Sequence, residues 1–337
     1  MTRIAAFALV PAIGAALLAT ASRGQPMLYK VAYVTDIAAT PDVHDLRGVA
    51  LLGFQRSVRR FRVQGRVVQF DPRQGVGPTL AYLARQRYDL VFIGEVRSGY
   101  DVDATVAVAK RFPQTRFVLT DPPFLERWPK NVQGSIWHVE QPAYLAGYLA
   151  GLMERRRPGR DVVGSVGGFP NIAVDAFIAG FEAGAKAADP RITTLRRYTY
   201  DFLNAAKCGS VARSEIAAGA GVLFNVAGAC GLGTLASARN GHVWGVGVDV
   251  DQSFLGSYVL TSVVKRFDVE IYDTVRALVD GRLETGANAV WDVRNGAVGL
   301  GRISPPVPPS LASRLDAIRA RIAAGEDGVW VAVPAPG

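Results

Sequence analysis

The sequence has 337 residues, of which 49% are apolar, and this length exceeds what one hydrophobic core usually accommodates. We therefore expect a globular protein with two domains. The formal net charge is +9, and the basic residues are mostly scattered arginines without interleaved aromatic residues, as in Arg56, Arg59, Arg60, Arg62 and Arg66. Such a distribution is typical of a solvated face and does not indicate a nucleic-acid partner.

The N-terminal residues, MTRIAAFALVPAIGAALLATAS, place Arg3 before an apolar run that closes on small residues. This order is typical of a secretory signal peptide, which we expect over residues 1–21 with cleavage near Ala21. A membrane-anchoring helix is the alternative, but Pro11, Gly14 and the shortness of the run argue against it.

From residue 28 onward, short apolar runs alternate with amphipathic stretches. The runs that read as strands are LYKVAYVTD, VVQFD, LVFIGE, RFVLTD, VQGSIW, VVGSVGG, ITTLRRY, GVLFNVA and VWGVGVD. Between them, apolar residues recur at helical spacing, for instance over 104–112, 143–155, 174–187 and 205–218. The alternation predicts an α/β protein whose parallel sheets are covered by helices on both faces.

Several predicted strands stop at a polar residue or a glycine where the next helix would begin, among them Asp36, Asp121, Gly228 and Asp249. In open α/β sheets, ligands bind at these carboxyl ends of the strands. Trp137, Phe169 and Phe202 follow other strands and could cover an apolar or planar ligand. The pattern therefore predicts a ligand-binding cleft between two lobes.

The sequence shows no recognisable catalytic centre. The glycine patterns GSVGGFP and GACGLG fall short of a dinucleotide-binding loop, and the three histidines accompany no nucleophile elbow or metal motif. We expect His138 and His242 to be surface or interface residues, whereas His44, beside Asp45 in the first strand-end loop, is a better ligand-binding candidate. We predict binding without chemistry, with no catalytic residue, metal or cofactor.

The two cysteines, Cys208 and Cys230, fall near the starts of successive predicted helices. An exported protein can form a disulfide, but a large core does not need one. A disulfide is possible, and two buried thiols are the preferred alternative.

Four longer stretches carry a resemblance that runs over nearly the whole mature chain: NVQGSIWHVEQPAYLAGYLAG, VGGFPNIAVDAFIAGFEAGA, YTYDFLNAAKCG and GVDVDQSFLGSYVLTSVVK. Together they resemble the basic membrane protein family, which comprises bacterial substrate-binding proteins of ABC importers. The resemblance implies the type I periplasmic binding fold, a ligand of the purine nucleoside or base type, and a membrane permease as partner. Family lipoproteins carry a cysteine after the signal, and its absence here implies a soluble periplasmic or secreted protein, which we expect to be a monomer.

By the same resemblance, Asp249 and Lys265 stand where the family grips the ribose, Phe202 where an aromatic ring stacks on the base, and Gly228 in the glycine loop. A carboxylate can accept hydrogen bonds from both vicinal hydroxyls of a sugar while an ammonium donates to their oxygens. From chemistry alone, Asp249 and Lys265 could equally form a structural ion pair at a strand end.

The first loop departs from the family pattern. Nucleoside-binding relatives carry an Asp-x-Ser-Phe-Asn run there, whereas this chain has TPDVHDLRG, with Leu46 and Arg47 near the expected Phe and Asn. The pair His44 and Asp45 is similar to a branch of the family associated with free purine bases. The sequence therefore leaves open whether the ligand is a nucleoside or a base.

We expect the chain to form a first lobe from residues 28–138 and 262–287 and a second lobe from residues 139–261 and 288–334, joined by a three-crossing hinge near His138, Ser262 and Asn288. Ligand would close the hinge by touching both lobes. We expect the site residues to divide between the lobes, with Lys265 by the hinge: Asp36, His44, Asp45 and Asp121 on the first, and Phe169, Phe202 and Asp249 on the second.

Two other classes of function are compatible with an exported chain of this kind. One is a sensory domain that reports a purine or sugar-like ligand, because the same fold serves several functions. The other is a nucleoside hydrolase, which is disfavoured because the strand-end aspartates are spread over different strands.

Overall fold

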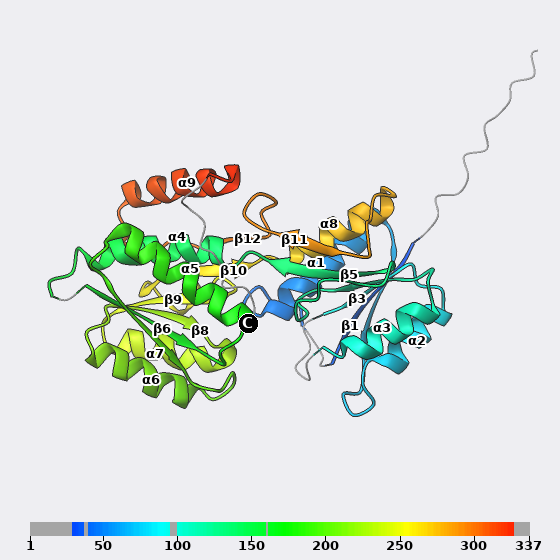
Figure 1. Cartoon of the computed structure of the whole chain (residues 1–337), viewed down its shortest axis with the longest axis horizontal. Coiled ribbons are helices and arrows are strands. Elements are labelled where there is room, and N and C mark those ends of the chain that lie inside the picture. Colours follow the sequence, from blue (N-terminus) through cyan, green and yellow to red (C-terminus); the bar gives the residue numbers. More distant parts are fainter. Residues whose placement is uncertain (1–28, 37–39, 95–99, 160, 327–337) are drawn as a thin grey trace, which may run out of the picture.

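The structure is a computed structural model that describes residues 29–36, 40–94, 100–159 and 161–326. The expected signal peptide, residues 1–21, and the outermost expected lobe residues, 28 and 327–334, lie outside the described residues. Two lobes lie side by side along the long axis of the molecule, each built on one sheet with helices on both faces (Figure 1). This architecture confirms the predicted α/β class.

The first sheet contains β1 (Lys30–Thr35), β2 (Gln64–Gln69), β3 (Leu90–Ile93), β4 (Arg116–Leu119), β5 (Val132–Trp137) and β11 (Asn288–Trp291). These strands are all parallel and lie in the order β11-β5-β4-β3-β1-β2. One face is covered by α1 (Leu46–Phe61) and α8 (Phe267–Val279), and the other by α2 (Gly77–Arg85) and α3 (Val102–Arg111).

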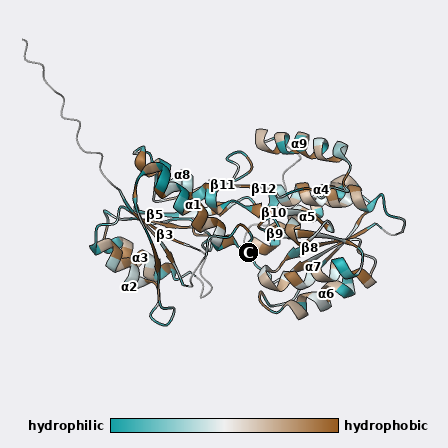
Figure 2. Ribbon diagram, turned by 180° about the vertical axis from the view of Figure 1, so that it is seen from behind, coloured by the Kyte–Doolittle hydropathy of each residue, from teal (hydrophilic) through white to brown (hydrophobic). Residues whose placement is uncertain are grey.

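Both faces of the central strands are buried, which explains why the runs read as continuously apolar in sequence. In β1, Val31 and Tyr33 pack toward α1 and α8, whereas Ala32 and Val34 pack toward α2 and α3. Figure 2 shows the apolar colouring of the strands inside both lobes and hydrophilic residues on outer helix faces, such as that of α8.

The second sheet contains β6 (Val162–Gly167), β7 (Thr193–Tyr198), β8 (Val222–Val226), β9 (Trp244–Asp249), β10 (Val259–Lys265) and the antiparallel β12 (Val298–Leu300). Their order is β12-β10-β9-β8-β6-β7. The surrounding helices are α4 (Glu140–Glu154), α5 (Ile172–Ala188) and α9 (Pro309–Ala324) on one side, and α6 (Ala205–Ala217) and α7 (Leu232–Asn240) on the other. Two short 3₁₀ turns, η1 (Gly228–Gly231) and η2 (Ser253–Leu255), follow β8 and β9.

The two sheets share one topology, in which the chain order reverses next to the first strand of each lobe, β1 or β6. Such switch points form crevices at the carboxyl ends of the strands. Those ends carry the predicted site residues of both lobes.

Three segments cross between the lobes. They join β5 to α4, β10 to α8, and β11 to β12. The expected boundaries differ from the sheet pairings at two of these crossings: residues 262–265 continue β10 in the second sheet, and residues 288–291 pair with β5 in the first. Short strands at a crossing read alike in sequence whichever sheet they join, so only the pairing assigns them.

Cys208 in α6 and Cys230 in η1 form a disulfide, with Cα atoms 5.6 Å apart. The preferred expectation of two buried thiols is therefore wrong. Strand β8 carries the chain from α6 to η1, and the two elements pack against each other, which brings together residues 22 positions apart.

Within the described ranges, no helix has the length and apolar character needed to cross a membrane.

Candidate functional site

The predicted site residues gather where the carboxyl ends of the two sheets face each other. In the first lobe, Asp36 follows β1, Asp121 follows β4, and Trp137 ends β5. In the second lobe, the contributing positions follow or end β6, β7, β8, β9 and β10; they are Phe169, Phe202, Gly228, Asp249 and Lys265. Parallel strands place these residues at the carboxyl-end edges of the two sheets.

Lys265 lies at the centre of the hinge. Its Nζ is 2.8 Å from Oδ2 of Asp121, so the last residue of β10 in the second sheet is tied to a loop of the first lobe. The lysine side chain is only 6% exposed, whereas that of Asp121 is 31% exposed. The ion pair therefore has a buried cation and a carboxylate that faces open space.

Aromatic rings from both lobes surround the Lys265 ammonium. Its Nζ lies 5.9 Å from the ring centroid of Trp137, 5.9 Å from that of Phe267 and 5.7 Å from that of Phe177. Ring faces attract a cation at such distances. The three rings thus add to the hold that Asp121 has on the ammonium.

Asp249 ends β9 beside the Lys265 strand, where it pairs in register with Val264. Its backbone is left-handed, with φ of 66°, a conformation that aspartate tolerates better than most residues but still at a cost. Burial raises the pKa of its carboxyl, the charge of Lys265 opposes that rise, and the negative charge of Asp121 adds to it. Asp121, Asp249 and Lys265 therefore form one electrostatic cluster.

A third acid, Glu270 of α8, lies behind this cluster. It is fully buried, and Ser135 of β5 donates a hydrogen bond to its Oε1. Burial raises its pKa well above the ordinary range, and nearby Asp121 contributes to the rise while Ser135 and Lys265 oppose it. Sequence reasoning missed Glu270, because an acid in the first turn of a helix usually marks only a favourable helix start.

A group of contacting aromatic rings follows β6 and β7 in the second lobe. The ring centroid of Phe169 lies 5.4 Å from that of Phe202 and 5.9 Å from that of Tyr200. Phe169 is 42% exposed and Phe202 is 39% exposed, although buried positions are the usual place for such side chains. Tyr200 was missed in sequence, and the signal that could have found it is its place two residues before Phe202.

Gly228 supports this aromatic surface. Its φ of +53° is in the left-handed region, and a Cβ there would lie 3.4 Å from the carbonyl oxygen of Phe202. Glycine thus allows the β8 loop to approach the Phe202 backbone without strain.

Trp137 is buried and belongs to the hinge packing. Its Nε1 donates to the carbonyl oxygen of Thr120 at 2.7 Å, and its ring lies 4.9 Å from Phe267 and 6.0 Å from Trp291. These contacts favour a packing role for Trp137 over direct ligand contact.

Asp36 is also buried, at 2% exposed, directly after β1.

His44 and Asp45 of the first loop make different contacts. Asp45 caps α1: its carboxylate accepts from the backbone N–H groups of Arg47 and Gly48 and pairs with the Arg47 guanidinium at 3.0 Å. Burial acts to raise the pKa of Asp45, but the hydrogen bonds and charge of Arg47 outweigh it and lower the pKa. The His44 ring instead contacts Phe254 of the second lobe, with centroids 4.0 Å apart.

A cavity of about 430 Å³ adjoins the cluster, and its size suits a small molecule. Asp249 and Lys265 form part of its wall together with Val43 of the first loop and Val49 and Leu52 of α1. A larger hollow of about 630 Å³ lies elsewhere on the second lobe, and it contains none of the predicted ligand-binding residues.

Comparison with known proteins agrees with this architecture. Residues 53–325 match the model of the Bmp family, described as ABC transporter substrate-binding protein PnrA-like. The chain belongs to the Bmp family. The predicted family is thus confirmed, and the protein is an extracytoplasmic substrate-binding protein of an ABC transporter, with a small-molecule ligand and a permease as its partners.

Two curated proteins are similar to this chain in sequence. The CD4+ T-cell-stimulating antigen of Listeria monocytogenes serovar 1/2a is 30% identical over 260 residues, which cover 72% of this chain and 70% of that protein. The ABC transporter nucleoside-binding protein BmpA of Lactococcus lactis subsp. cremoris is 30% identical over 217 residues, covering 59% and 60%.

Solved structures confirm the type I periplasmic binding fold. An ABC transporter solute-binding protein from Conexibacter woesei has 26% identity and a TM-score of 0.70, covering 88% of this chain and 97% of its own. A transcriptional activator of the comK gene from Bacillus halodurans has 19% identity and a TM-score of 0.74, covering 89% and 98%. The second likeness is one of fold alone.

Proposed function

We propose that this Bmp-family protein captures a purine nucleoside, or a closely related purine compound, between its lobes and presents it to an ABC permease. Two observations support the proposal. Asp249 and Lys265 line one cavity, and Lys265 pairs with Asp121 of the other lobe. Exposed aromatic rings follow β6 and β7 at the same carboxyl-end edge of the second sheet, and we propose that both groups face one ligand. A relative of similar sequence is named a nucleoside-binding protein, which supports the same class of ligand.

The aromatic part suits the base of such a ligand. Phe169 and Phe202 retain exposed ring surface while packing on each other, so a planar ring can stack on Phe202 without displacing a core contact. Stacking of a base on an aromatic side chain contributes about 1–3 kcal/mol and tolerates any base, since every base has a π-face.

The charged part suits the sugar. The carboxylate of Asp249 can accept hydrogen bonds from two vicinal hydroxyls, and the Lys265 ammonium can donate to their oxygens. Hydrogen bonds of this charge-assisted kind are about twice as strong as neutral ones. Because Asp121 already accepts from Lys265, a bound hydroxyl would join an existing network.

The state of the first loop favours a nucleoside over a free base. The carboxylate of Asp45 is occupied by the cap of α1 and by Arg47, so this group is poorly placed to accept from a base. The Asp249 carboxylate and the Lys265 ammonium, in contrast, suit a ligand that carries a sugar or a similar diol.

Closure of the lobes would link capture to delivery. A ligand stacked on Phe202 in the second lobe and bonded near Asp121 in the first would bind the closed form better, as closure requires. The permease would then bind the closed form of the protein in preference to the open form.

A thermal-shift screen of the mature protein against nucleosides, free bases, sugars and amino acids tests the proposal. A purine nucleoside at 100 times its dissociation constant should add about 2.7 kcal/mol of stability. The double variant Phe202→Ala, Asp249→Asn serves as control and should show a much smaller shift. Absence of a shift with every purine compound, or an equal shift in the double variant, would overturn the assignment.

A further inference from the structure

One end of the first lobe carries a concentration of arginines, which we call the basic pole; it consists of Arg59, Arg60, Arg62, Arg66, Arg85 and Arg87. All six side chains are exposed. None of them forms an ion pair with a carboxylate in the described part of the chain. From Leu46 to Phe70 the sequence contains no acidic residue, so α1 and β2 supply no counter-charge of their own.

The backbone brings these arginines together around Lys30, the first residue of β1. Lys30 pairs in register with Gln64, which lies between Arg62 and Arg66. The Lys30 Nζ donates to the carbonyl oxygen of Gln86, which lies between Arg85 and Arg87, at 3.2 Å. The basic pole therefore surrounds the start of β1, at one end of the first lobe (right-hand end of Figure 1). One carboxylate lies there, that of Asp89, which accepts from the Lys30 backbone N–H at 2.8 Å.

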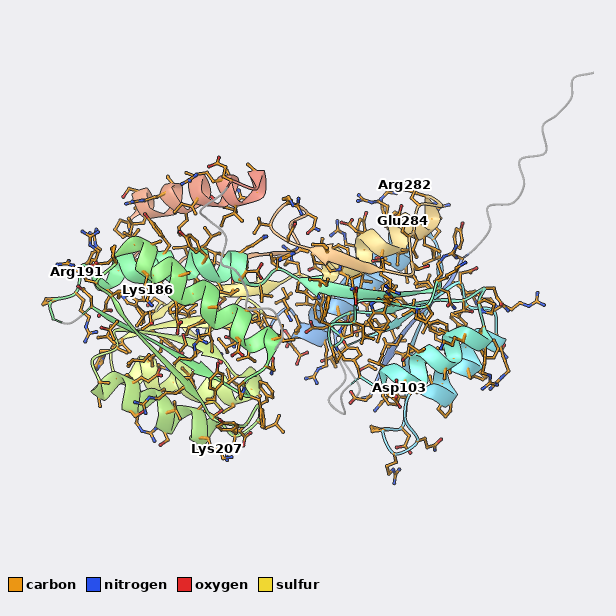
Figure 3. All side chains as sticks on the ribbon, in the orientation of Figure 1. Asp103, Lys186, Arg191, Lys207, Arg282 and Glu284 are labelled. Carbon is orange, nitrogen blue, oxygen red and sulfur yellow. A yellow bond between two sulfur atoms is a disulfide. The ribbon has the colours of Figure 1, made fainter. Side chains whose placement is uncertain are left out.

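The corresponding end of the second lobe is built differently. There Arg191 pairs with Asp189 at 3.4 Å and Arg157 pairs with Glu154 at 2.9 Å. Arg191 is labelled at that far end of the molecule in Figure 3. Arg156, next to Arg157, is exposed and forms no ion pair with a carboxylate among the described residues, so the second lobe also has unpaired arginines, but there they stand among paired ones. Both ends contain helix C-termini, where cations are favourable, so the helix dipole alone does not explain the six unpaired arginines of the basic pole.

Two of these arginines occupy backbone positions that favour glycine. Arg62, at the end of α1, has φ of 53°, and Arg87, after α2, has φ of 57°. Glycine or asparagine is usual where a helix ends in this left-handed conformation. Both positions therefore carry backbone strain that glycine would avoid, and both place an exposed guanidinium group at the basic pole.

We propose that the basic pole docks on an anionic phospholipid surface. Guanidinium groups bind phosphate oxygens in a bidentate way, and arginines near a membrane add to its attraction for the protein. Exposed apolar side chains lie beside the arginines: Val67 of β2 is 44% exposed, and Tyr82 of α2 is 46% exposed. A tyrosine with an exposed ring suits the headgroup region, whereas phosphates of a duplex offer no apolar layer.

The path of the chain is compatible with docking at the basic pole. The N-terminal stretch with its apolar run joins the first lobe at Tyr29, whose carbonyl oxygen accepts from Gln64 N at the basic pole. The chain therefore enters the first lobe at this pole. The strands run from the pole toward the cleft, so docking there leaves the cleft free.

Co-sedimentation with vesicles tests the proposal. The mature protein should bind vesicles of phosphatidylglycerol and phosphatidylcholine at low salt, should be released at high salt, and should not bind phosphatidylcholine alone. The variant Arg60→Gln, Arg66→Gln, Arg85→Gln should weaken binding by about a hundredfold. The matched control Arg156→Gln, Arg213→Gln, Arg239→Gln makes the same charge change at exposed arginines of the second lobe and should weaken it far less.

Ligand affinity is measured in parallel and should be unchanged, because neither triple variant alters a candidate site residue. A failure of the membrane proposal can therefore be distinguished from a failure of the proposed function. Equal loss in the two triple variants would show that net charge alone acts and would overturn the proposal. So would unchanged vesicle binding in the first variant, or retention on duplex DNA without vesicle binding.

Discussion

The Nζ of Lys265 lies 2.8 Å from Oδ2 of Asp121, so the C-terminal end of β10 in the second sheet is bonded to a loop of the first lobe. A buried ammonium that lost this carboxylate would be left in a largely apolar setting, at a cost of several kcal/mol. Lys265 and Asp249 of the second lobe line the same cavity, and the charge of Lys265 opposes the rise of the Asp249 pKa. Lys265 therefore connects the hinge to the candidate ligand site.

Replacing Lys265 by methionine should weaken ligand binding. Methionine retains the aliphatic length that packs among the rings but removes the donor, so affinity should fall by about tenfold to a hundredfold through loss of a charge-assisted bond. Isothermal titration calorimetry with the best ligand measures the change. Lys186→Met, at an exposed position of α5, is the control and should bind as wild type; equal affinity in both variants would remove Lys265 from the site.

Phe202→Ala should reduce affinity for a planar ligand by about 1–3 kcal/mol, since it removes the stacking surface. Leu203→Ala is a neighbouring control, because Leu203 is 64% exposed and lies outside the aromatic contacts. Calorimetry of the two variants should show a loss only in the first. If both bind alike, Phe202 serves only to pack against Phe169.

The disulfide should stabilise the second lobe. It closes a loop between residues separated by 22 positions, for which chain entropy predicts about 3 kcal/mol. Urea unfolding of the wild type should shift to lower denaturant concentration when a reductant is added. The double variant Cys208→Ala, Cys230→Ala should unfold at that lower concentration and should not respond to reductant; a response there would assign the effect to something other than this bond.

Glu215 should make stability depend on pH. It is fully buried in α6, and burial raises its pKa to about 8 from an ordinary value near 4.5, with the charge of Arg197 opposing part of the rise. An acid with a raised folded-state pKa contributes fully below its unfolded pKa, and the contribution is lost as pH rises through the folded value. The free energy of unfolding should therefore decline between about pH 5 and pH 8, by roughly 5 kcal/mol at most from this group.

Glu215→Gln should flatten that decline, and urea unfolding at several pH values measures it. Glu154, whose pKa burial raises to about 7, titrates in the same range, so the informative quantity is the difference between variant and wild type. Glu284→Gln, at an exposed position, is the control. A decline as steep in Glu215→Gln as in the wild type would contradict the account.

Much of the fold could be read from the sequence because both faces of its strands are buried. The continuous apolar runs around Val31 and Val163 mark parallel strands, and polar residues directly after such runs lie at the carboxyl edge. This reasoning placed Asp121 and Asp249 at strand ends, whereas Lys265 was assigned by the family resemblance. It could not show that Asp121 is the carboxylate nearest Lys265, because 144 residues separate them and only the packing of the two lobes sets the distance.

Other features depended on local competition that a pattern does not resolve. Asp45 stands directly before an amphipathic helix, and its role as the cap of α1 was available from that position, yet its neighbour His44 suggested ligand binding. The pairing of Asn288–Trp291 with β5 and the approach of Cys208 to Cys230 follow from tertiary contacts, so neither could be derived from spacing.

The central claim is that Asp249 and Lys265 hold the two hydroxyls of a nucleoside's sugar. Isothermal titration of the wild type and of Asp249→Asn with inosine, hypoxanthine and 2′,3′-dideoxyinosine tests it most directly. The account predicts that the wild type binds inosine most tightly, and that Asp249→Asn lowers inosine affinity by about tenfold to a hundredfold while hardly changing the weak dideoxyinosine affinity. Hypoxanthine binding as tight as inosine binding, with both unchanged in Asp249→Asn, would contradict it and would return attention to His44 and Asp45.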